Sequence, residues 1–130
     1  MNPANGPGQR ANVRDMGVPV QLRAALAAVV ERLAAGDYQG LKRDGIDPQP
    51  TADLSLWIRN YASAGATITP LPEAAWESAS AIPITGHPGV WAVVVPLWTI
   101  EEGMSDLSME ATVSESPDGV SVVIDDIHVL

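Results

Sequence analysis

The spacing of apolar side chains changes once along this chain, and that change constrains the fold more than any other feature. Between Val20 and Ala35 the apolar residues recur at helical intervals. The stripe consists of Leu22, Leu26, Val29, Val30 and Leu33. After Gly65 the apolar residues alternate with polar ones, which is the repeat of a strand. Helices followed by strands predict an α+β domain with N-terminal helices packed on a mostly antiparallel sheet.

The helical half divides at glycine and proline residues. Residues 1–19 are rich in Gly, Pro and Asn and predict a disordered tail, which leaves residues 20–130 as a single α+β domain. Gly36 ends the first helix, and Asp37 caps a short second helix that runs to the turn at residues 44–45. A third helix is predicted from Thr51 to Gly65.

The second half predicts strands at residues 67–69, 78–84, 90–99, about 104–113 and 120–130. On the fourth of these, alternation turns Leu107, Met109, Ala111 and Val113 inward. The strand at 90–99 is apolar on both faces, so we expect helices over one face and a pocket or a dimer partner over the other. Within it, Pro96 indicates an edge position or a bulge.

Charge is distributed unevenly along the chain. No Lys or Arg follows Arg59, and the 71 residues after it carry ten acidic groups, which accounts for a net charge of −9. Such a surface is a poor partner for nucleic acid and a suitable one for a basic protein.

The sequence contains no Cys, which excludes disulfides and thiolate chemistry. We find no secretory signal and no apolar run that approaches a membrane span, so we expect a cytoplasmic protein without a membrane partner.

Two stretches carry a resemblance to a known family. They are Leu97-Trp98-Thr99-Ile100-Glu101-Glu102-Gly103-Met104-Ser105-Asp106-Leu107 and the terminal Asp125-Asp126-Ile127-His128-Val129-Leu130. The chain resembles a bacterial domain family of unknown function from about Leu22 to Leu130, and this resemblance implies no activity, cofactor or catalytic residue. The order of elements is also similar to the cystatin-like and NTF2-like cone, which implies a curved sheet around a helix.

His128 is the more informative of the two histidines. A regular last strand would turn Asp126 and His128 to the core side, where the pair could perform general acid–base chemistry in a cone pocket. A β-bulge at residues 125–126 would reverse the parity and turn both side chains to water. The other histidine, His87, lies in a Gly-Pro turn and is expected to be a solvated loop residue.

A metal site is a further alternative. Glu101, Glu102 and Asp106 surround one hairpin, and Asp125 and Asp126 lie on a candidate neighbouring strand, so their oxygens suit Ca²⁺ or Mg²⁺. No EF-hand spacing is present, and solvated carboxylates at a hairpin are the ordinary explanation. We therefore predict neither a metal nor a cofactor.

These observations lead to a non-enzymatic, acidic, protein-binding domain as the first hypothesis, with an immunity- or antitoxin-type inhibitor of a basic partner as its most concrete form. The predicted contact residues are Trp98, Glu101, Glu102, Asp106, Asp125 and Asp126. One alternative is a small-molecule binding protein or lyase/isomerase-like enzyme that uses Asp126 and His128. Another is a structural homodimer formed through the second apolar face of the strand at 90–99.

Overall fold

The computed structural model describes residues 17–48, 54, 58 and 67–129. The tail predicted at 1–19 and most of the helix predicted at 51–65 therefore lie outside the described residues. Within that helix, Leu54 and Ile58 are helical and buried. The helical elements are α2 (Val20–Ala34), α3 (Tyr38–Arg43) and the 3₁₀ helix η1 (Glu73–Glu77). None of the described helices is long and apolar enough to cross a membrane.

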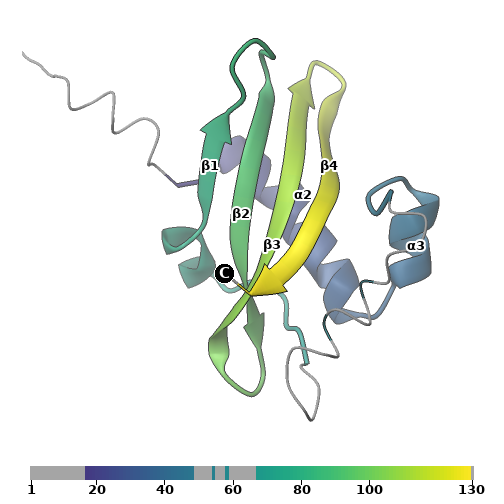
Figure 1. The fold of residues 1–130 in the computed structure, drawn as a ribbon, viewed down its shortest axis with the longest axis vertical. Coiled ribbons are helices and arrows are strands. Elements are labelled where there is room, and N and C mark those ends of the chain that lie inside the picture. The colour runs from purple at the N-terminus through teal and green to yellow at the C-terminus, as the bar shows by residue number, and fades with distance from the viewer. Residues whose placement is uncertain (1–16, 49–53, 55–57, 59–66, 130) are drawn as a thin grey trace, which may run out of the picture.

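Four strands form one antiparallel, curved and open sheet in the order β1-β2-β3-β4. They are β1 (Ser80–Pro83), β2 (Val90–Thr99), β3 (Gly103–Ser116) and β4 (Gly119–Val129). Figure 1 shows α2 crossing behind one face of this sheet, with α3 beside β4. Helices on one side of a meander are the arrangement that the change of period predicts, and the α+β class is confirmed.

The predicted stripe of α2 faces the sheet. All five of its apolar residues are buried, and Leu22, Leu26 and Val30 have no exposed surface. Gly36 follows with a φ of 75°, which suits glycine and ends the helix. The Asp37 carboxylate then accepts a hydrogen bond of 3.1 Å from the Gly40 amide, so it caps α3 as predicted.

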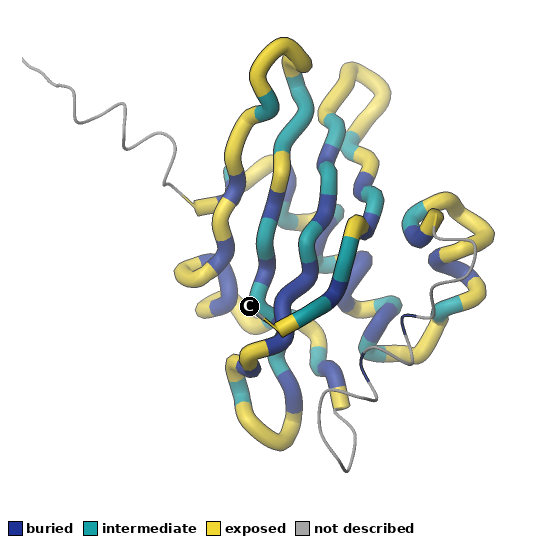
Figure 2. The backbone as a smooth tube through the Cα atoms, in the orientation of Figure 1, coloured by how far each residue is buried: buried dark blue, intermediate teal, exposed yellow. Residues whose placement is uncertain are grey.

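The sheet's inner face completes the core. Val93, Val95 and Leu97 of β2 are buried against the same cluster. The four residues of β3 predicted to face inward are also buried. Figure 2 shows this alternation as bands of buried and more exposed backbone along the central strands. Helix α2 thus covers one face, as expected for the strand at 90–99.

Pro96 sits beside an irregularity of the β2–β3 pairing. Pro96 pairs with Ser108, but Trp98 pairs with Met104, so β3 contains extra residues opposite Leu97. The bulge that Pro96 indicated is present. The buried Ser105 hydroxyl donates a 2.8 Å hydrogen bond to the Leu97 carbonyl and accepts one of 3.1 Å from the Leu107 amide. Its side chain therefore satisfies backbone groups that the bulge takes out of the ladder.

Candidate functional site

The candidate site is the face of the sheet that points away from α2, which we call the outer face. Its residues are Ser80, Ile82, Val90, Ala92, Val94, Pro96, Ser108, Glu110, Thr112, Ser114, Val123, Asp125, Asp126 and His128. Among the described residues no helix lies over this face (Figure 1). Apolar Ile82, which has 55% of its surface exposed, therefore shares this face with the carboxylates of β3 and β4.

A β-bulge in β4 decides which way the terminal residues point. Glu110 pairs with Asp126, whereas the next residue of β3, Ala111, pairs with Ile124. Asp125 is therefore the extra residue, and the inward position passes from Ile124 to Ile127, which are both buried. Of the two parities that the sequence left open, the structure has the bulged one, with Asp126 and His128 on the outer face.

This placement brings three titratable side chains together. The Nε2 atom of His128 lies 2.5 Å from Oε2 of Glu110 and 3.8 Å from Oδ2 of Asp126. The Nδ1 atom lies 3.2 Å from the Val129 carbonyl oxygen. Each ring nitrogen thus faces an oxygen acceptor, and both can donate only when the imidazole is protonated. All three side chains are between one third and one half exposed.

The surroundings of His128 favour its charged form. The hydrogen bond to Glu110 raises the pKa of His128, followed by the bond to the Val129 carbonyl. The negative charges of Asp126 and Glu110 act in the same direction, and partial desolvation opposes them. These contacts favour a protonated imidazole beside the carboxylates, in a part of the sequence that has no Lys or Arg.

Asp125 joins the same face through Thr112. The Thr112 hydroxyl donates a 2.7 Å hydrogen bond to Oδ2 of Asp125. Glu110 and Thr112 are alternate residues on one side of β3, so their side chains lie about 7 Å apart along the strand. The carboxylates of Glu110, Asp125 and Asp126 therefore occupy neighbouring positions on the outer face.

The hairpin residues predicted as contacts have different environments. Glu101 accepts hydrogen bonds from the Thr67 amide (3.1 Å) and the Thr67 hydroxyl (2.9 Å). The amide bond and then the hydroxyl bond lower the pKa of Glu101. Glu101 thus fastens residues 67–69 to the end of β2, where Ile68 forms a bridge with Thr99. This carboxylate has a structural role that the sequence did not reveal.

The remaining predicted contacts lie near the bulge of β3. Glu102 is exposed, and its amide donates a 3.1 Å hydrogen bond to the Thr99 hydroxyl. Asp106 is exposed and borders a hollow of about 210 Å³ together with Pro96 and Met104. Trp98 is half-buried and paired with Met104. The structure therefore groups Asp106 with the outer face and separates Glu101 from it.

The arrangement limits which chemistry the site supports. His128 and Asp126 lie on an open strand surface, where Glu110 holds the imidazole. Within the described parts of the chain, no three His, Asp or Glu side chains gather in a way that could hold a metal ion. His87 is exposed in the turn between β1 and β2, where its backbone amide donates a hydrogen bond to the Ile84 carbonyl. This environment is the one expected for a loop residue. Carboxylates and partly exposed side chains characterise this face.

Sequence reasoning missed Glu110 as the main partner of His128. The alternation of β3 had turned Glu110 outward, but its neighbour on β4 depends on the pairing register. That register includes a bulge, which was only one of two alternatives. Assuming the bulge and a tight turn at residues 116–119 would have placed Glu110 opposite Asp126.

Comparisons with known proteins give a family and no function. Neither the curated proteins nor the solved structures provide a match, so the likeness to the cystatin-like and NTF2-like cone is not confirmed. A domain of unknown function, DUF7668, matches residues 30–130, which include the end of α2, α3, the whole sheet and the candidate face. On this match the chain belongs to the DUF7668 family.

Proposed function

We propose that this domain binds a basic protein through the outer face of its sheet. The observation that carries the proposal is that Glu110, Asp125 and Asp126 share a sheet face over which no described helix lies, and whose strands contain no Lys or Arg. His128 contacts Glu110 and Asp126 and adds a positive charge to this face when its imidazole is protonated. Carboxylates without enough internal cations attract a positively charged surface.

The face also offers apolar contact area. Ile82 and Met104 are 55% and 49% exposed, and half-buried Pro96 lies on β2 opposite Ser108. Lys and Arg carry apolar stems that cover such surface while the charged head reaches a carboxylate. The hollow at Pro96, Met104 and Asp106 is suited to one stem of this kind. Mixed acidic and apolar surface thus favours a folded basic protein over a simple cation.

Electrostatic attraction would act mainly on association. The net charge of −9 and the acidic face steer a cationic partner, and the effect weakens as salt screens it. Inhibition of a basic toxin in the cytoplasm is the most specific form of this proposal. It rests on the charge distribution of the chain.

Matched charge variants test the proposal. Asp106→Asn with Asp126→Asn removes two charges from the acidic region, and Glu31→Gln with Glu77→Gln removes two exposed charges elsewhere. Proteins captured from the source lysate by the wild type are eluted with salt, identified, and measured for their association rate. We expect a basic protein whose association slows by roughly tenfold or more with the first pair and little with the control pair.

Two results would overturn this proposal. One is equal slowing by both pairs, which would assign the effect to net charge alone. The other is a dimer seen by sedimentation whose interface buries Ile82 and Val94, because the outer face would then be occupied by a second copy. The homodimer alternative predicts association that strengthens with salt, since like charges are screened.

A further inference from the structure

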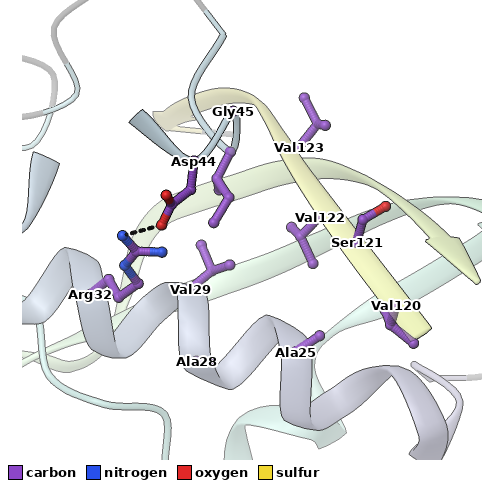
Figure 3. A pocket seen from close by; sticks show the side chains of 11 residues that line it. Ala25, Ala28, Val29, Arg32, Asp44, Gly45, Val120, Ser121, Val122 and Val123 are labelled. Carbon is purple, nitrogen blue, oxygen red and sulfur yellow. Dashed lines mark ion pairs between the residues drawn. The ribbon is translucent and has the colours of Figure 1, made fainter. Parts of the chain in front are cut away.

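The open edge of β4 lies beside an apolar groove, on a different side of the molecule from the outer face. We call this the β4 groove. It has a volume of about 400 Å³ and is lined by Ala25, Ala28 and Val29 of α2 and by Val120 and Val122 of β4. The loop after α3 closes one end, where Arg32 forms a 2.9 Å ion pair with Asp44 (Figure 3).

The backbone of β4 shows how an extended chain sits on this edge. The Ile124 amide donates a 2.7 Å hydrogen bond to the Ile46 carbonyl, so it points away from β3. In an antiparallel strand such groups alternate, and the amides and carbonyls of Val120 and Val122 therefore point away from β3 as well. Among the described residues, Ile46 provides the one backbone hydrogen bond to this edge outside the sheet. Ile46 thus makes one of the hydrogen bonds that a fifth strand would make, and none of its described neighbours makes another.

The sequence of this edge lacks the usual protection. Residues 119–124 (Gly-Val-Ser-Val-Val-Ile) contain neither a charge nor a proline. Natural proteins commonly protect an exposed edge with charges, proline or a bulge. Here the first such feature is the bulge at Asp125, which ends the open part. Residues 120–123 thus present an unprotected edge of about 13 Å.

We propose that the β4 groove binds an extended segment of a partner protein, which adds to the sheet as a fifth strand. Its backbone bonds to Val120 and Val122, and one apolar side chain enters the groove between α2 and β4. Exposed Asp118 and Asp125 bracket the open edge, and the segment therefore carries basic residues on each side of its apolar centre. Asp125 is the one carboxylate that this surface shares with the outer face, and the proposal does not depend on the function proposed for that face.

Charge argues against a second copy as the occupant. Antiparallel pairing of two β4 edges about Ser121 and Val122 brings Asp118 of each copy close to Asp125 of the other. Each copy also has a net charge of −9. Like charges opposed across a strand pair are destabilising.

The blocked peptide Lys-Val-Thr-Val-Thr-Val-Lys is a direct probe. Its control, Lys-Pro-Thr-Val-Thr-Pro-Lys, keeps the charge, the central Val and the apolar character, but lacks the backbone donors of the two outer Val residues, which face β4 in this pairing. We expect the first peptide to shift the amide resonances of Val120 and Val122 in the full chain and to slow their hydrogen exchange. The proline peptide should bind at least tenfold more weakly.

Two helix variants locate the bound peptide. Ala28→Gln narrows the groove from an exposed, helix-compatible position, and Ala24→Gln makes the same change outside it. We expect Ala28→Gln to weaken peptide binding at least tenfold, and Ala24→Gln and the Asp106/Asp126 pair to leave it unchanged. Equal binding of the two peptides, equal effects of the helix variants, or no response at Val120 and Val122 would overturn the proposal. A dimer with both amides protected in the absence of peptide would also overturn it.

Discussion

The imidazole Nε2 of His128 lies 2.5 Å from Oε2 of Glu110, on the neighbouring strand. Their strands are paired so that Glu110 stands opposite Asp126, which places the imidazole diagonally across the ladder. The contact thereby ties the end of β4 to β3 beyond the bulge. Because His128 lies near the end of β4, this contact holds the last residues of that strand against β3.

Stability should fall as pH rises through the titration of His128. Its folded pKa is raised by Glu110 above the usual value of about 6.5, so the folded state binds more protons in this range. The contribution is complete below the unfolded pKa and is lost as pH rises through the folded pKa. Thermal unfolding between pH 5.5 and about 8.5 measures this loss. We expect His128→Gln to flatten the slope and His87→Gln to retain it; an unchanged slope in His128→Gln would contradict this account.

Glu110 should raise the pKa of His128 more than Asp126 does. The Asp126 carboxylate is 3.8 Å from Nε2 and acts through charge, whereas Glu110 accepts a hydrogen bond. We expect Glu110→Gln to lower the pKa of His128 toward its usual value, and Asp126→Asn to lower it less. Imidazole chemical shifts measured against pH distinguish the two variants. A larger change in Asp126→Asn would mean that the solution geometry differs from this contact.

Local repeats account for what the sequence predicted well. Leu22, Leu26 and Leu33 define the buried side of α2 through their spacing alone, and Leu107 to Val113 define the inner side of β3 in the same way. In both cases the neighbours along the chain determine the face. The α+β class follows from the order of these elements.

The features that the sequence predicted poorly depend on pairing between residues far apart in the chain. Two parities were consistent with Asp125 and Asp126, because an extra residue in β4 is visible only against Glu110 and Ala111 of β3. The bonds from Thr67 to Glu101 likewise join residues 34 positions apart. No local repeat encodes such a contact, so the sequence did not show that the Glu101 carboxylate, predicted as a partner contact, accepts hydrogen bonds from Thr67.

Two glycines in the turn between β1 and β2 should differ in their tolerance of alanine. Gly86 and Gly89 have φ values of 83° and 80°, so alanine is strained at both, by about 1–2 kcal/mol. A Cβ added at Gly89 would also lie 2.6 Å from the Glu115 carbonyl oxygen, whereas a Cβ added at Gly86 would meet no atom within 4 Å.

The backbone at Gly89 has little freedom to relieve this clash, because its carbonyl accepts a 2.7 Å hydrogen bond from the Glu115 amide. We expect Gly89→Ala to destabilise the protein clearly more than Gly86→Ala in urea unfolding. Equal losses would show that β2 and β3 move apart at this point without cost.

The Ser105 hydroxyl should contribute to stability well beyond an ordinary surface serine. It is 6% exposed, donates to the Leu97 carbonyl and accepts from the Leu107 amide, so it bonds both strands at the bulge. Ser105→Ala leaves these buried backbone groups without their partner, which costs about 1–3 kcal/mol. Ser80→Ala removes an exposed hydroxyl from β1 and should change the free energy of unfolding by less than about 0.5 kcal/mol. Urea unfolding of both variants compares them directly, and equal small losses would mean that water or a local shift satisfies the bulge in place of Ser105.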